Sequence, residues 1–515
     1  MFVHIRQNRC PSPCLTWSAL YRASAQLALL GCGVLWATLG HTEWREYPDK
    51  HISLITNIEP ARAAKLLQHL GWFRQVADAY IEAPVHDHLP PVQLVVFASR
   101  KTFNKVVNQR HFAAYTQPDI ARTTLVVGPE DNGDVIESSL HEYVHYRLRT
   151  QAIGYPRWYE EGLAVLLSAA EFTVEDGQVT ATIGRRLPAK LQYNALALPK
   201  PASLLTTADQ EDWPLARLAS YYKQSAYLLR YLLHAELPQN KQQALQIYLE
   251  QRDIDLLSKL EMDASALSRA LKEFRQNPRR ARQLKIQSAS NEALRPPASQ
   301  PLTRTSQLTL LANLAESPNP GFAITTYRKL AKRNPTEVRY WAWLARTQMA
   351  RNERAAARSL ERAADLDPGH PDVLIQQTRL KLRQCPLDET LTCLPTWRSA
   401  SAPLRQALDR NPEHFQGILW LGVTELYSGY AGRALNYLRI AHQRAPWSPM
   451  VNFHLGECLR LLGNPRGYNH LQRAMWWAQD AELQNAARLA LQTWRDTQPA
   501  AATGTDNGAN EHSLE

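Results

Sequence analysis

The feature that most constrains this chain of 515 residues is a pattern that recurs every 34 residues toward its C-terminus. The recurring residues are Leu421, Gly422 and Gly429 in one unit, and Leu455, Gly456 and Gly463 in the next. Small residues let paired helices approach closely, large residues fill the gaps between them, and a proline ends the second helix. A period of this length predicts stacked pairs of helices.

The spacing within one unit resembles the tetratricopeptide repeat at Leu421, Gly422, Gly429, Ala434, Leu438, Ala441 and Pro446. An upstream unit, one residue short between its helices, has Trp341, Leu344, Ala345, Ala356, Leu360, Ala363 and Pro368. Ala323, Tyr327 and Pro335 suggest a first unit, and Leu404, Ala407 and Pro412 close a third. The resemblance implies an all-α solenoid over residues 303–495 that recruits a protein partner.

A second motif, HEYVH, carries the chemistry of a metal site. It begins at His141 and ends at His145, so on a helix both imidazoles lie on one face and reach the same Zn²⁺. Glu142 lies to the side, where its carboxylate can act as the general base for a metal-bound water. The other interpretation is a surface helix with two solvated histidines. Five apolar residues beside the motif argue for a packed helix, namely Val135, Ile136, Leu140, Val144 and Leu148.

A catalytic zinc site needs a third protein ligand. After a short loop, the segment RWYEEGLA begins a second helix that can return across the first. Its first turn holds Glu160 and Glu161, and either carboxylate can face the two imidazoles. Their other interpretation is an acidic first turn favoured by the helix dipole. Spacing alone leaves the choice between the two glutamates open.

HEYVH followed by W-x-x-E-G-L-A resembles the bacterial gluzincin domains called peptidase-MA-like, in which the glutamate directly before the glycine is a zinc ligand. The resemblance implies one Zn²⁺ held by His141, His145 and Glu161, with Glu142 as the catalytic base. The later segment Tyr222-Lys-Gln-Ser also resembles that family. One position departs from related sites, because Val165 stands where an acidic residue often orients a histidine. A role for Tyr222 as oxyanion stabiliser competes with that of an ordinary packed tyrosine.

The chain upstream of the repeats predicts an α+β domain, with strands early and helices late. Together with the resemblance, the fold class expected is a zincin-like (gluzincin) α+β domain followed by the tetratricopeptide solenoid. The expected segments are a signal peptide or membrane anchor at 1–40, the metallopeptidase-like domain at 45–275, a linker at 276–302, the repeats at 303–495 and a disordered tail at 496–515. A hairpin is predicted over 172–183, with Asp176-Gly177 at its turn.

The N-terminus indicates export. Arginines precede an apolar run over 23–39 and glutamates follow it, which places the rest of the chain outside. We therefore expect a bacterial periplasmic protein, or one anchored in the membrane and facing the periplasm. Cleavage, lipidation at Cys32 and an uncleaved anchor stay open. In an exported protein, the spacing of Cys385 and Cys393 favours a local disulfide over two free thiols.

The net charge of the chain does not identify a class of partner. The formal net charge is +11, but Lys and Arg are spread along the chain and no nucleic-acid motif accompanies them, so we expect no nucleic-acid partner. Two functions remain. The first is an exported zinc metallopeptidase, an endopeptidase by preference, that cleaves a protein or peptide substrate recruited by the repeats. The alternative is a non-catalytic envelope assembly or scaffold protein that acts through the repeats.

Overall fold

The structure is a computed structural model. It describes residues 43–81, 92–108, 114–118, 123–129, 135–150, 155–186, 204–205, 213–250, 255–275, 281–287, 298–385, 392–478 and 481–497. The predicted targeting segment, with Cys32, lies outside this part of the chain, and so does the predicted tail from residue 498 onward. None of the described helices is long and apolar enough to span a membrane.

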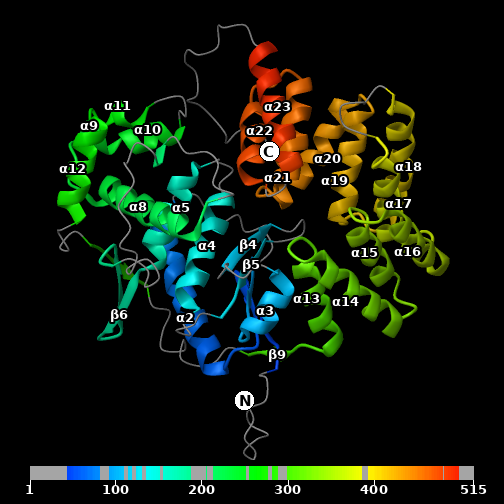
Figure 1. The fold of residues 1–515 in the computed structure, drawn as a ribbon, viewed down its shortest axis with the longest axis horizontal. Helices are drawn as coiled ribbons and strands as arrows, with labels where there is room; N and C mark the ends of the chain where they lie inside the picture. The colour runs from blue at the N-terminus through cyan, green and yellow to red at the C-terminus, as the bar shows by residue number, and fades with distance from the viewer. Residues whose placement is uncertain are drawn as a thin grey trace, which may run out of the picture. The chain divides into compact units, whose positions relative to one another are not determined.

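A six-stranded mixed sheet forms the centre of the N-terminal part, in the order β4-β5-β3-β2-β1-β9 (Figure 1). Its strands are β1 (Arg45–Tyr47), β2 (Ile52–Thr56), β3 (Val92–Val96), β4 (Ala114–Pro118), β5 (Thr123–Val127) and β9 (Gln300–Pro301). Strands β2, β3 and β5 run parallel, and β4, β1 and β9 are antiparallel to their neighbours. Every residue of β2 and β5 is buried, because both faces of the parallel strands are covered.

A smaller sheet has the order β6-β7-β8. Its strands are β6 (Glu171–Glu175), β7 (Gln178–Ile183) and β8 (Arg282–Ile286). Strands β6 and β7 form the predicted hairpin, and both turn residues have positive φ, 49° at Asp176 and 78° at Gly177. Two consecutive residues with positive φ match the twist of the strands, which is why an Asp-Gly pair suits this turn.

Helices cover both sheets. They are α2 (Pro60–Tyr80), α3 (Arg100–Val107), α4 (Ile136–Thr150), α5 (Arg157–Ser168), α8 (Leu215–His234), α9 (Gln239–Gln242), α10 (Ala244–Glu250), α11 (Leu256–Lys259) and α12 (Ala264–Arg275). Proline at the first position of α2 presets its backbone for a helix. One core joins α2, α4, α5 and α8 to the parallel strands. This is an α+β arrangement, and its assignment to the zincin class stays a prediction.

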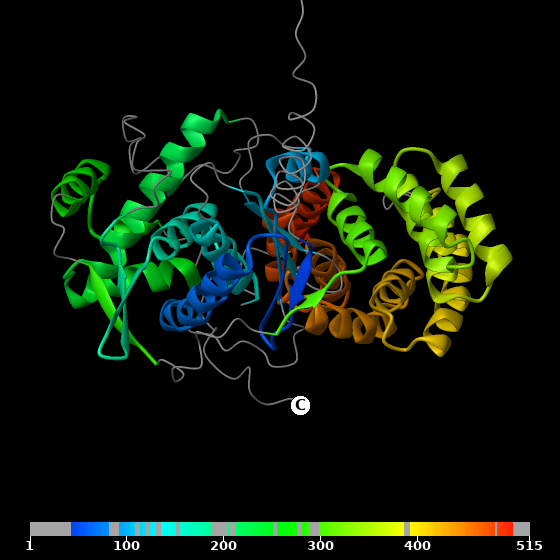
Figure 2. The same cartoon turned by 90° about the horizontal axis from the view of Figure 1, so that it is seen from below.

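The C-terminal part is an all-α stack of paired helices that follow one after another, as the repeat spacing predicts (Figure 2). The pairs are α13 (Arg304–Ala315) with α14 (Pro320–Arg333), α15 (Val338–Gln348) with α16 (Glu353–Leu366), α17 (Pro371–Leu382) with α18 (Leu394–Arg410), α19 (Phe415–Tyr427) with α20 (Ala431–Arg444), and α21 (Pro449–Leu461) with α22 (Gly467–Trp477); α23 (Ala481–Thr497) follows. The small residues of the pattern are buried between helices, among them Ala345, Ala356, Ala434 and Ala441.

The predicted linker at 276–302 is partly wrong. Strand β8 pairs with β7, and β9 pairs with β1 at the edge of the large sheet. The polar, proline-containing sequence resembles a loop, but an edge strand needs only one hydrogen-bonded neighbour and tolerates charged side chains. The predicted tail is also two residues too long, since α23 continues to Thr497.

The first repeats share a core with the large sheet. Phe97, Phe103 and Val126 pack in one cluster with Ala312, Tyr327 and Leu344 of α13, α14 and α15. The hydroxyl of Tyr327 also donates a hydrogen bond to Glu316, which in turn pairs with Arg346. The start of the solenoid is therefore part of the packed N-terminal region.

Candidate metal centre

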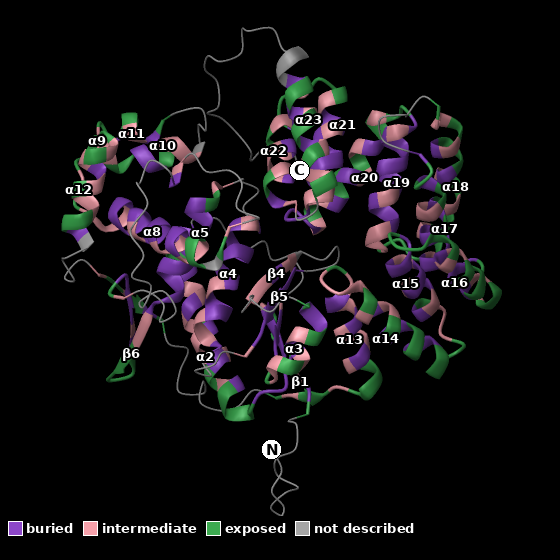
Figure 3. Cartoon of the chain, viewed as in Figure 1, coloured by how far each residue is buried: buried purple, intermediate pink, exposed green. Residues whose placement is uncertain are grey.

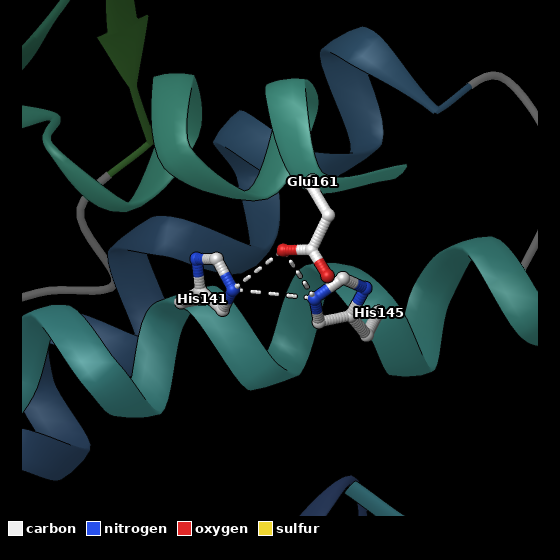
Figure 4. A group of neighbouring side chains, drawn as sticks. All are labelled: His141, His145 and Glu161. Atoms are coloured by element: carbon white, nitrogen blue, oxygen red, sulfur yellow. Dashed lines mark hydrogen bonds and ion pairs between the residues drawn. The ribbon is translucent and has the colours of Figure 1, made fainter. Parts of the chain in front are cut away.

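Helix α4 presents both histidines of the motif on one face. His141 and His145 are one turn apart, and their Nε2 atoms lie 3.2 Å from each other (Figure 4). The adjacent side of α4 is held in the core by Leu140, Val144 and Leu148. The apolar residues beside the motif thus fix the rotation of the helix, and with it the direction of the two imidazoles.

Helix α5 supplies the third group. Glu161 Oε2 lies 3.5 Å from His141 Nε2 and 3.6 Å from His145 Nε2. Figure 4 shows the carboxylate facing the two rings from the neighbouring helix. These three side chains form the one cluster of potential metal ligands among the described residues. Glu160, the competing candidate, is buried but lies outside the cluster.

The spacing of these atoms fits a zinc ion. Two ligand atoms about 2.1 Å from a tetrahedral zinc lie about 3.4 Å apart. The three separations, 3.2, 3.5 and 3.6 Å, scatter around that value. Glu161 Oε2 is buried and accepts no hydrogen bond from the described residues, although an unpartnered buried carboxylate oxygen is costly. A cation between the three groups would satisfy it.

Burial and charge act against each other at the site. Figure 3 shows α5 buried along most of its length, and Glu161 is 8% exposed. Burial alone would raise the pKa of Glu161, but the two histidines hold the pKa of this carboxyl well below its usual value. Burial would lower the pKa of His145, yet the carboxylates of Glu161, Glu142 and Glu160 together outweigh burial and the pKa is raised. The site thus favours a negative carboxylate beside positive charge.

Glu142 is placed at the edge of the metal cluster. Its Oε2 accepts a hydrogen bond of 2.7 Å from the hydroxyl of Thr116 on the edge strand β4. Residue Glu142 is 7% exposed. No sequence signal pointed to Thr116, because strand β5 lies between β4 and the motif in the sequence and nothing in the sequence of β4 marks it as a neighbour of α4. The role of Glu142 as a general base stays a prediction.

The two remaining segments of the family resemblance meet behind the site. A Cβ built on Gly162 would lie 2.7 Å from the backbone oxygen of Ser225 on α8, so only glycine fits at this crossing of helices. One turn earlier on α8, Tyr222 interacts with both Glu161 and Arg157. Burial and the Glu161 charge raise the pKa of Tyr222. The glycine after the ligand therefore sets how close α8 comes to Glu161.

Within the described part of the chain, His145 lacks the hydrogen bond that usually orients a zinc-binding histidine. Its Nδ1 is buried and makes no hydrogen bond to the described residues. Val165, at the position where an acidic residue often serves this purpose, packs against Ala226. Zinc-binding histidines usually donate their second N–H to a carboxylate or a carbonyl, and among the described residues His145 lacks this support.

Comparison with known proteins identifies repeat proteins. No family model matches the chain, and no curated protein matches its sequence. Among solved structures, TTC0263, a thermophilic tetratricopeptide protein of Thermus thermophilus, is 20% identical over 36% of this chain and 99% of its own, with a TM-score of 0.30. PilF of Pseudomonas aeruginosa is 15% identical over 37% of this chain and 88% of its own, with a TM-score of 0.27. Yeast Tom70 is 12% identical over 70% of this chain and 73% of its own, with a TM-score of 0.26.

The prediction that the chain is a zinc metallopeptidase is corrected by these comparisons. The solved structures that the comparison returns are tetratricopeptide-repeat proteins. The misleading signal was HEYVH with Glu161, which predicts a zinc site and does not by itself specify a reaction. The part of the prediction that holds is the stack of paired helices in the C-terminal part.

Proposed function

We propose that this protein is a non-catalytic assembly protein, which recruits a partner protein through its repeats and holds one Zn²⁺ in its N-terminal domain. The observation that carries the proposal is the continuous solenoid from α13 to α23, which packs directly onto the large sheet. Extended surfaces of stacked helix pairs are built for binding other chains. The N-terminal domain then serves as the base from which the repeats extend.

The first helices of the repeats offer the binding surface. Helix α15 contacts α17, α17 contacts α19, and α19 contacts α21, while the second helices are more weakly connected to one another. In a curved stack, the row of helices in closer contact lines the inner side. Trp343 and Trp420 lie on this row and stay partly exposed, as aromatic residues at protein interfaces often do.

The zinc proposal concerns His141, His145 and Glu161. It is supported by their mutual distances, by the burial of His145 and Glu161, and by the Glu161 oxygen that makes no hydrogen bond to the described residues. When bound, the ion would supply a cross-link between α4 and α5, and its charge would compensate the buried carboxylate. Three protein ligands are one fewer than closed structural sites have, so we expect a solvent molecule as the fourth.

An exported location is proposed with this function. Cys385 and Cys393 form a disulfide between the end of α17 and the start of α18, with their Cα atoms 5.6 Å apart. Structural disulfides persist in oxidising compartments. The bond supports the location that the N-terminal sequence suggests, in the periplasm or on a membrane that faces it.

Genetic complementation tests the proposal. In a deletion strain of the source organism, Glu142→Gln should restore function as well as wild type does, because assembly needs no general base. Glu160→Gln is the matched control, since it changes a neighbouring buried acid outside the cluster. The double variant His141→Ala with His145→Ala should lose zinc, and with it the stability of the domain. If Glu142→Gln abolishes function while the protein stays folded and zinc-loaded, the non-catalytic proposal is wrong.

A further inference from the structure

We propose that the N-terminal domain binds a phosphate group between α8, the end of β7 and the start of β8, at the guanidinium of Arg230. Arg230 lies on α8, one turn before His234, and Gly184 directly follows β7. Arg282 begins β8 and is the register partner of Ile183, so it lies next to Gly184. Two arginines, a histidine and a bare stretch of backbone therefore meet at one place. The site shares no residue with the metal cluster and goes beyond the proposed function.

Arg230 is a buried guanidinium without a counter-ion among the described residues. It is 6% exposed, and its Nε and Nη2 make no hydrogen bond within the described part of the chain. Phe274 of α12 packs on it, with the ring centre 5.2 Å from the Arg230 Cζ. Two arginines beside the site differ, because Arg185 and Arg186 both pair with Glu171. A buried charge is costly unless it is paired, so Arg230 indicates a ligand that brings the missing negative charge.

The backbone of Gly184 brings two nitrogen atoms to one point. A Cβ built on Gly184 would lie 3.2 Å from Arg230 Nε and 3.2 Å from His234 Nδ1. The two nitrogens are therefore no more than twice that distance apart, and hydrogen bonds of about 2.9 Å from each can end on oxygens of the same phosphate. Gly184 has a φ of 81°, which favours glycine, and glycine also lets a ligand approach the backbone closely.

Tyr80, the last residue of α2, determines which nitrogen of His234 carries the proton. Its hydroxyl lies 2.8 Å from His234 Nε2. Burial raises the pKa of Tyr80 to about 12, so the hydroxyl keeps its proton and donates it to Nε2. The proton of a neutral imidazole is then on Nδ1, the nitrogen that faces Gly184. Arg282 lies over the Tyr80 ring, with its Cζ 5.3 Å from the ring centre, and places a second guanidinium beside the histidine.

The charge of the site favours phosphate over a single carboxylate. Arg230 and Arg282 carry two positive charges, and in the described part of the chain neither is joined to a carboxylate. A phosphate monoester carries a charge of about −1.5 to −2 at pH 7 and has three oxygens that accept hydrogen bonds from several directions. The planar fork of a guanidinium matches two of these oxygens at once. A small soluble ester and a lipid headgroup present the same oxygens.

The test measures binding by the full chain with inorganic phosphate, glycerol 3-phosphate and succinate at equal ionic strength. We expect both phosphates to raise the melting temperature as their concentration rises, and succinate to have no such effect. Arg230→Met keeps the length of the side chain without its charge, and calorimetry should find phosphate bound at least about tenfold more weakly. Arg217→Met is the matched control, because Arg217 also lies on α8 and over an aromatic ring, that of Trp213, but is exposed.

Three outcomes would overturn the proposal. They are no rise in melting temperature with either phosphate, an equal rise in wild type and Arg230→Met, and an equal effect of succinate and phosphate. If Arg230→Met does not fold, Arg282→Gln takes its place, since Arg282 is exposed, and unchanged phosphate affinity in that variant also overturns the proposal. Zinc content should be the same in wild type and in the arginine variants, so this test is independent of the metal centre.

Vesicles distinguish the two sources of the phosphate group. Wild type and Arg230→Met are sedimented with phosphatidylcholine vesicles that contain or lack phosphatidate. If phosphatidate retains wild type but not Arg230→Met, the phosphate belongs to a lipid headgroup. If the two proteins sediment equally while only wild type binds glycerol 3-phosphate, the ligand is a soluble phosphate ester. Both outcomes support a phosphate site at Arg230.

Discussion

Replacing Gly162 by alanine should separate α5 from α8 and disturb the metal centre. A Cβ at this position would lie 2.7 Å from the Ser225 oxygen and 2.9 Å from its carbonyl carbon, whereas ordinary contacts begin near 3.4 Å. The helices must therefore move apart by roughly 0.7 Å, and the atoms in the way are backbone atoms that cannot rotate aside.

The change in the free energy of unfolding caused by Gly162→Ala follows from two opposing effects. Alanine favours a helix over glycine by roughly 1 kcal/mol. Overpacking of a tight crossing typically costs roughly 1–3 kcal/mol, and here the upper end applies because backbone meets backbone. We expect Gly162→Ala to lower the free energy of unfolding by roughly 2 kcal/mol. Glu161 is adjacent, and a shift of this size exceeds the tolerance of about 0.2 Å of a metal site, so zinc affinity should fall at least about tenfold.

Gly71→Ala provides the matched control. Gly71 lies in helix α2, is exposed, and has no atom within 4 Å of the position that a Cβ would take. The same substitution there should raise the free energy of unfolding by up to about 1 kcal/mol. Urea denaturation followed by circular dichroism measures both variants, and elemental analysis measures zinc. If both variants shift stability in the same direction, the packing argument at Gly162 is refuted.

Three further perturbations have defined outcomes. We expect elemental analysis to find about one equivalent of zinc in the wild type and none in His145→Ala. Added chelator should then lower the melting temperature of the wild type only, and equal responses would contradict the metal site. Burial lowers the pKa of His454 to about 3. Because the unfolded chain takes up the proton below about pH 6.5 and the folded chain does not, the free energy of unfolding of the repeats should fall by roughly 3 kcal/mol between about pH 6.5 and 4. In acid titrations, His454→Gln should flatten that dependence. Reducing the Cys385–Cys393 disulfide should lower the free energy of unfolding of the repeats by roughly 2–3 kcal/mol. The change is measured as a shift in the urea midpoint, and the variant with serine at both positions should show the same shift without reductant. No shift would mean that the disulfide does not stabilise the repeats.

Local patterns predicted the helices well, because their signals lie within one element. The i, i+4 spacing placed His141 and His145 together, and the 34-residue period placed the repeats. The Asp176-Gly177 turn was equally clear, since its positive φ values are demanded by the hairpin itself.

Contacts between distant segments were harder to predict. Strands β1, β4 and β9 are short and polar, and they are strands only because a neighbour far away in the sequence offers hydrogen bonds. The carboxylate that faces the histidines could not be chosen from spacing, because Glu160 and Glu161 differ by about 100° around α5, and the rotation of α5 is set by its contact with α8. Thr116, which binds Glu142, was missed for the same reason.

The cluster in which Phe97 and Phe103 meet Tyr327 has a mechanical consequence. A solenoid joined to its neighbour by a flexible tether would swing freely, and a load on its bound partner would stretch only the tether. Here the load passes through packed side chains into the large sheet, and through β9 into the edge of that sheet. The repeats are therefore held to the sheet by packed side chains. If the chain were cut at residue 303, each of the two fragments would expose aromatic side chains that are buried in the whole protein.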